Sequence, residues 1–141
     1  MFSFLYGGNQ IKKVNFEDIQ YAIQYPQRFL LINTLPLSEQ DCLINGTLDA
    51  TQEETVVNEV ITRVDVPDKI IIIYGRNAND PSTERKYKQL RGLGIVDIMI
   101  YSGGLFEWLL LQDIYGEKEF PTTRKLRDIL KYKSSRQLDC Y

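Results

Sequence analysis

The stretch IIIIYGRNANDPSTERKYKQL, residues Ile70 to Leu90, carries three structural signals in succession. The run Ile70–Tyr74 is apolar throughout, which is typical of a strand buried on both faces. Gly75 then opens a polar loop, and Pro81 suits the first position of a helix that we expect to end near Leu93. A strand that ends abruptly before a helix is where many α/β proteins place a nucleophile or bind an anion.

The rest of the chain alternates short apolar runs with amphipathic segments. Besides the run already quoted, the sequence predicts four strands: 11–14, 28–33, 42–48 (broken by an Asn-Gly turn signal) and 97–101. Helical patterns follow most of them: 15–24, 51–61, 81–93 and a short one from 105 that contains Trp108. Apolar strands separated by helices favour a parallel sheet. We therefore predict an α/β fold whose mostly parallel sheet has about five strands, with helices on both faces.

The composition excludes several kinds of active site. The chain has 141 residues, two cysteines and no histidine. Without histidine there is no Ser-His-Asp or Cys-His nucleophile, and the cysteines are too far apart in sequence for a zinc motif. The longest apolar run is far shorter than the roughly 18 residues of a membrane span. We expect an intracellular protein, cytoplasmic by default, with no transmembrane segment, no metal and no cofactor.

The charge of the chain is unevenly distributed. Residues 121–136 contain six basic residues and one acidic residue, a net charge of +5, while the remainder carries −7 of the total of −2. We predict a domain at 1–120 followed by a basic C-terminal helix and tail at 121–141, with Leu126, Ile129 and Leu130 packed on the domain. The alternatives are contact with an acidic partner, a membrane surface or nucleic acid. Since Tyr132 is the one aromatic residue among these charges, we expect another protein as the partner and no specific nucleic-acid binding.

Within this pattern, residues 11–116 resemble a rhodanese-like domain. The segment FLLINTLP (29–36) resembles the early strand of that family, and CLINGTL (42–48) resembles its Gly-His-Ile-Pro-Gly-Ala-Ile segment. The most specific match is LRGLGIVDIMIYSGGLFEW (90–108), which ends in the family's Gly-Gly-x-x-x-Trp. The resemblance implies the rhodanese-like fold.

The departures from the family pattern fall on functional positions. The family's catalytic cysteine corresponds to Gly75, and the arginine with which its phosphatases grip phosphate corresponds to Pro81. The Asp and Arg of the early strand become Asn33 and Leu35, and the family's histidine becomes Leu43. The resemblance therefore implies a catalytically inactive variant without sulfurtransferase activity, and we expect that the chain is not an enzyme.

The loop at the former active site is left with little capacity to bind an anion. We expect Asp80 to cap the following helix, and its fixed negative charge disfavours a second anion. Arg76 alone favours one, and it can equally point into solvent. The candidate site, a vestigial active-site loop, consists of Gly75, Arg76, Asn77, Ala78, Asn79 and Asp80.

Three functions stay open on the sequence alone. The leading hypothesis is a non-catalytic rhodanese-like module for protein interaction or scaffolding. The second is a sulfurtransferase or phosphatase of the same fold that works through an atypical residue such as Cys42. Against it, Glu39 and Asp41 are expected to raise the pKa of that thiol, which favours a structural cysteine. The third is a sensor of a small ligand or anion that uses the loop Gly75–Asp80.

Overall fold

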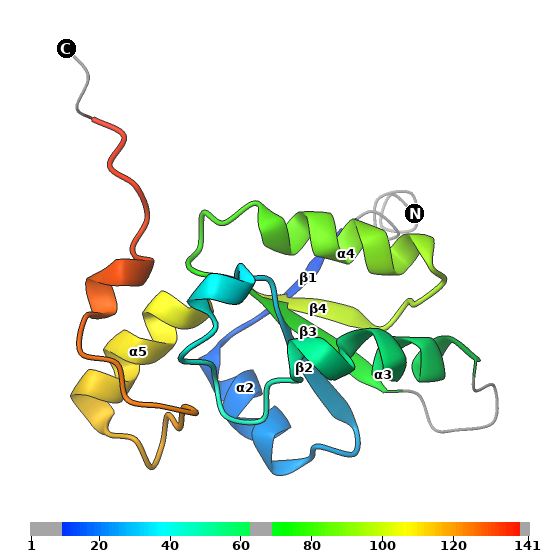
Figure 1. Ribbon diagram of the computed structural model, residues 1–141, viewed down its shortest axis with the longest axis horizontal. Helices are drawn as coiled ribbons and strands as arrows, with labels where there is room; N and C mark the ends of the chain where they lie inside the picture. Colours follow the sequence, from blue (N-terminus) through cyan, green and yellow to red (C-terminus); the bar gives the residue numbers. More distant parts are fainter. Residues whose placement is uncertain (1–9, 63–68, 139–141) are drawn as a thin grey trace, which may run out of the picture.

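The structure is a computed structural model that describes residues 10–62 and 69–138. Its centre is one parallel sheet in the strand order β1-β4-β3-β2 (Figure 1). The four strands are β1 (Lys12–Val14), β2 (Phe29–Asn33), β3 (Ile70–Tyr74) and β4 (Ile98–Tyr101). The predicted α/β class and parallel sheet are confirmed, but the number of strands is four instead of about five.

The missing strand is the one predicted at 42–48. This segment makes only isolated bridges, from Ile44 to Thr122 and from Thr47 to Leu31. Between the two, Gly46 has a φ of +89°, and the Thr47 N–H donates to the Ile44 carbonyl at 3.0 Å. The Asn-Gly signal therefore forms a complete turn, which leaves too few extended residues on either side for a strand.

Within residues 10–62 and 69–138, four α-helices cover the sheet, two on each face, and the prediction of helices on both faces is confirmed. α2 and α5 pack on one face, and α3 and α4 lie side by side on the other (Figure 1). Two short 3₁₀ helices, η1 and η2, lie in the connections. The bounds are α2 (Phe16–Gln24), η1 (Leu37–Glu39), α3 (Ala50–Thr62), α4 (Ser82–Gly92), α5 (Gly104–Tyr115) and η2 (Ile129–Tyr132). None of the helices in the described ranges is long and apolar enough to cross a bilayer.

The two faces of the sheet form two separate cores because side chains alternate along each strand. Ile71 and Ile73 pack under α3 and α4, whereas Ile72 and Tyr74 pack under α2 and α5. Trp108, in α5, is fully buried in the second core, and its indole N–H donates to the Pro121 carbonyl at 3.2 Å. Trp108 therefore anchors this core.

The basic α-helix predicted in the C-terminal segment does not form. The segment runs extended past residues 43–45, with hydrogen bonds from Asn45 N–H to the Pro121 carbonyl and from Thr123 N–H to the Leu43 carbonyl. Because residues 43–45 need these partners, the segment is drawn into an extended conformation before the single turn of η2. Leu130, predicted to pack inward, is 61% exposed, and the fully buried residue is instead Tyr132.

Candidate functional site

The loop from Gly75 to Asp80 leaves the carboxyl end of β3, at the centre of the sheet, and is held from one side by the start of α5. The Leu105 N–H donates to the Gly75 carbonyl at 2.9 Å, and the Phe106 N–H donates to the Arg76 carbonyl at 2.8 Å. The first N–H groups of α5, which are the usual anion donors of a helix, are therefore bound to the loop itself. Gly104, with a φ of +70°, makes this close approach possible.

Asp80 closes the loop from the inside. One carboxylate oxygen accepts the Arg76 N–H at 2.9 Å, and the other accepts the Ser82 N–H at 2.9 Å and the Ser82 hydroxyl at 2.7 Å. Burial raises the pKa of Asp80, but these hydrogen bonds outweigh it and hold the pKa below its ordinary value. The predicted start of α4 is wrong by one residue: the cap position is held by Pro81, and Asp80, directly before it, accepts hydrogen bonds from Ser82, the first residue of the helix.

The carboxylate of Asp80 lies where a side chain at position 75 would have to go. A Cβ atom built on Gly75 would be 2.5 Å from Oδ2 of Asp80 and 3.0 Å from Oγ1 of Thr34. The first of these distances is below any normal van der Waals contact. The space that the rhodanese resemblance assigns to a catalytic cysteine is therefore filled by a negatively charged group that already has its own hydrogen-bond donors.

The remaining side chains of the loop hold a strap, which we define as residues 129–134. Arg76 forms an ion pair with Glu39, donates to the Lys131 carbonyl at 2.8 Å and lies over the Tyr132 ring at 5.6 Å. Asn77 donates to the Tyr132 carbonyl at 2.8 Å, and Asn79 donates to the Ser134 hydroxyl at 3.1 Å. Arg76, which the sequence offered as the one group favouring an anion, is therefore engaged by protein groups, and Ala78 is exposed at the tip of the loop.

Cys42 is not part of this loop and is fully buried. Its thiol donates to the Arg124 carbonyl at 3.1 Å, in the C-terminal segment. Burial raises the pKa of Cys42, and the charge of Asp41 adds to the effect. The sequence prediction named Glu39 and Asp41 as the causes; the structure shows that burial is the larger cause. In the described part of the chain, no group of His, Cys, Asp or Glu residues is arranged to hold a metal ion.

Next to the loop, on the α3/α4 face, the structure has a pocket that the sequence analysis did not predict. Its volume is about 360 Å³. Asn33, Thr34 and Leu35 contribute from the end of β2 and the residues after it, and Gln40 follows η1. The other walls come from the first turn of α3 and from the part of α4 between Ser82 and Gln89. No motif could indicate this pocket because its lining comes from four separate stretches of the sequence.

Comparison with solved structures places this architecture among rhodanese-like domains. A crystal structure of the Alr3790 protein from Anabaena sp. matches with 22% identity and a TM-score of 0.54, over 77% of this chain and 89% of that one. The solution structure of the rhodanese-like domain of the same protein matches with 18% identity and a TM-score of 0.54, over 94% and 97%.

A third structure, the Saccharomyces cerevisiae single-domain sulfurtransferase RDL2, matches with 19% identity and a TM-score of 0.55, over 75% of this chain and 94% of that one. No protein-family model and no curated protein matches the chain. At these identities the likeness shows the fold, and the chain has the rhodanese-like α/β fold.

Proposed function

We propose that this chain of rhodanese-like fold acts as a non-catalytic module that binds another protein. The observation that carries the proposal is the Asp80 carboxylate, which fills the position of a nucleophile beside Gly75 and accepts the Arg76 N–H. In an active loop of this kind, backbone N–H groups stabilise a thiolate or a bound anion. Here the carboxylate of Asp80 occupies the place of that thiolate or anion and accepts the Arg76 N–H.

The alternative, an enzyme that works through Cys42, has less support. A reactive cysteine needs an accessible sulfur and a lowered pKa. Cys42 is fully buried, its thiol is engaged with the Arg124 carbonyl, and its pKa is raised. The sensor hypothesis for the loop is weakened in the same way, because Asp80 repels an incoming anion and Arg76 is paired with Glu39.

The absence of catalysis is tested by restoring the cysteine. In a thiosulfate:cyanide assay we expect no turnover by the wild type or by Gly75→Cys. The new thiol of Gly75→Cys lies against Asp80, so its pKa should stay at or above about 8.5, the value of a free cysteine. In Gly75→Cys/Asp80→Ala the Arg76 N–H is released toward the sulfur, and the pKa should fall by about one unit or more. Thiol alkylation as a function of pH, in a Cys140→Ser background, measures both values.

Wild-type turnover that is lost in Cys42→Ser would establish the enzymatic alternative and remove the proposal. A low thiol pKa in Gly75→Cys alone would show that Asp80 does not block the position. The matched control is Asp80→Ala with Gly75 retained, which has the opened loop but no thiol.

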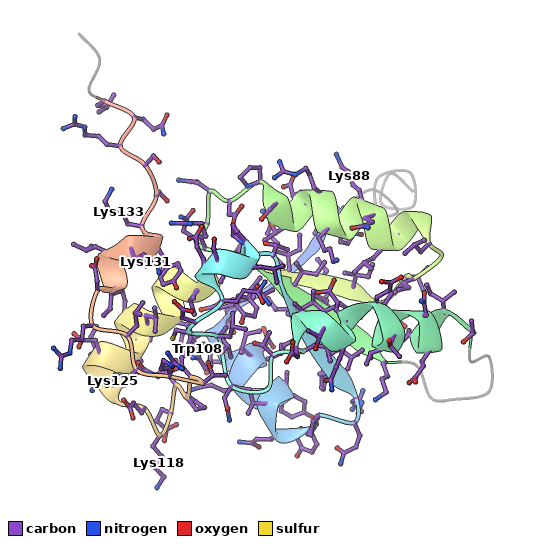
Figure 2. All side chains as sticks on the ribbon, in the orientation of Figure 1. Lys88, Trp108, Lys118, Lys125, Lys131 and Lys133 are labelled. Atoms are coloured by element: carbon purple, nitrogen blue, oxygen red, sulfur yellow. The ribbon has the colours of Figure 1, made fainter. Side chains whose placement is uncertain are left out.

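The protein-binding part of the proposal rests on exposed positive charge. The side chains of Arg124, Lys125, Arg127, Lys131 and Lys133 are all exposed. Figure 2 shows Lys118, Lys125, Lys131 and Lys133 on the side of the molecule formed by α5 and the C-terminal segment. Lys125 pairs with Glu117 at 3.5 Å, but residues 121–136 keep a net charge of +5, and such an excess favours a partner of the opposite sign and speeds its association. We propose an acidic protein surface as the partner.

A comparison of two charge-neutralised proteins tests this surface. We expect Lys125→Gln/Arg127→Gln/Lys133→Gln to capture the partner from a native extract about tenfold more weakly than the wild type, since each exposed charge contributes about 0.2–1 kcal/mol. The control removes the same number of exposed charges elsewhere, in Lys12→Gln/Lys13→Gln/Lys88→Gln. Quantitative mass spectrometry of the captured proteins gives the ratio. Equal loss in both variants would contradict a specific role for the C-terminal segment.

A further inference from the structure

The turn at Asn45 and Gly46 combines an exposed asparagine with an unhindered glycine. Both residues are exposed, and no described residue forms a hydrogen bond with the side-chain amide of Asn45. Gly46 has a φ of +89°, and a Cβ built on it would meet nothing within 4 Å. The backbone N–H of Gly46 donates to no described residue. The side chain of Asn45 and the peptide unit that follows it are therefore free to turn toward each other.

An asparagine in this setting can react with its own backbone. The Gly46 nitrogen gives its proton to solvent and attacks Cγ of Asn45. The new nitrogen–carbon bond closes a five-membered succinimide, the bond from Cγ to Nδ2 breaks, and Nδ2 leaves as ammonia. Water then opens the ring: attack at Cγ gives aspartate, and attack at the backbone carbonyl gives isoaspartate, in which the main chain runs through the side chain. Glycine favours the first step because it has no Cβ to obstruct the approach.

The other asparagines in the described part of the chain are less suited to this reaction. Each of them is followed by a residue that has a Cβ: Asn15, Asn33, Asn58, Asn77 and Asn79. Asn33 is also only 5% exposed. The residue after Asn58 lies inside α3, where backbone N–H groups bond to carbonyls one turn earlier. Asn45 is therefore the position at which the reaction should occur first.

Asn45 also lies where residues 42–48 hold the C-terminal segment. Its backbone N–H donates to the Pro121 carbonyl at 3.0 Å, and the Thr123 N–H donates to the Leu43 carbonyl at 2.8 Å. Isoaspartate lengthens the main chain of the turn by one methylene group. Because the hydrogen bonds on either side of the turn depend on its length, the added atom moves the N–H of residue 45 out of line with its acceptor.

We propose that Asn45 is a site of spontaneous deamidation, and that isoaspartate at this position loosens the contact between residues 42–48 and the C-terminal segment. Both products also place a negative charge next to residues 121–136, whose net charge is +5. The proposal is independent of a protein partner, since the reaction consumes only water and releases ammonia.

The reaction is followed by mass spectrometry of the full chain after incubation in mildly alkaline buffer. The tryptic peptide of residues 29–63 contains Asn33, Asn45 and Asn58, so one peptide supplies the site and two internal controls. An unincubated sample corrects for deamidation during digestion. We expect Asn45 to convert before Asn33 or Asn58 shows any change, with isoaspartate detected by an isoaspartyl methyltransferase. Asn45→Gln should block the conversion, because glutamine has to close a six-membered ring. Conversion of all three asparagines at one rate would overturn the assignment.

The effect on the C-terminal segment is measured by hydrogen exchange. Each product has one more negative charge than the wild type, so ion-exchange chromatography separates it from the unchanged chain. In the isoaspartate product we expect the Thr123 amide to exchange about fivefold faster, the amount that corresponds to one lost hydrogen bond. Freshly purified Asn45→Asp has the same charge without the added methylene, and should exchange as the wild type does. Wild-type exchange in the isoaspartate product, or equal acceleration in Asn45→Asp, would overturn the proposed loosening.

Discussion

Gly104→Ala is expected to destabilise the protein by about 2–5 kcal/mol. Its φ of +70° costs a residue with a Cβ about 1–2 kcal/mol. The added Cβ would also lie 2.8 Å from the backbone nitrogen of Asn77 and 2.9 Å from the Gly75 carbonyl oxygen. These are backbone atoms of the loop, so relief requires the loop and α5 to separate, at a further cost of about 1–3 kcal/mol.

Urea denaturation followed by circular dichroism measures this free energy of unfolding. Gly92→Ala is the matched control. Gly92 is the last residue of α4, and a Cβ built on it would meet no atom within 4 Å. We expect that variant to be unchanged or more stable by about 0.5–1 kcal/mol. A Gly104→Ala protein as stable as Gly92→Ala would contradict the close packing of α5 on the loop.

Tyr132→Ala is expected to cost about 3–5 kcal/mol, the usual range for an aromatic residue removed from a core. Tyr132 is fully buried in the core under α2 and α5, although it comes from the charged C-terminal segment. Its backbone carbonyl accepts the Asn77 amide, and its ring lies beneath the Arg76 guanidinium. We therefore expect the strap and the loop to lose protection from hydrogen exchange together, before the sheet does.

Two controls separate the ring of Tyr132 from its hydroxyl and from the rest of the strap. Tyr132→Phe loses only a long hydrogen bond, 3.4 Å, to the Glu39 carbonyl, and should cost less than about 1 kcal/mol. Leu130→Ala changes a residue that is 61% exposed and should be nearly neutral. Equal losses in Tyr132→Ala and Leu130→Ala would mean that the strap is not docked. For the same reason a chain cut at residue 120 is a poor test of the basic segment, since it also removes part of the core.

Local signals predicted the elements that have one dominant pattern. The apolar run of β3, the helical pattern of α2 and the Gly-Gly pair before α5 are each readable from a few adjacent residues. Each prediction that failed depended on a distant partner. The segment at 42–48 and the C-terminal segment bind each other through Ile44 and Thr122, and this pairing replaces the strand and the helix that each pattern favours alone.

In the candidate site, too, the features that depend on adjacent residues were predicted, and those that depend on distant contacts were not. The loop Gly75–Asp80 was identified from the sequence, and so was the role of Asp80 as an acceptor at the start of α4. The sequence could not show that the Asp80 carboxylate fills the space beside Gly75, because this contact depends on how a six-residue loop folds back on itself. Tyr132 appeared in the sequence only as an aromatic residue among charges, and its burial depends on contacts with residues more than fifty positions away.

The position of Asp80 also constrains how this chain can change over generations. A cysteine at position 75 brings its Cβ against the carboxylate, and loss of the carboxylate alone leaves the Arg76 and Ser82 N–H groups without their acceptor. Each single step lowers stability, and only the two together open a loop around a thiol. Substitutions in direct contact are not additive. Positions 75 and 80 are therefore coupled: a thiol at position 75 has room only when the carboxylate at position 80 is removed as well.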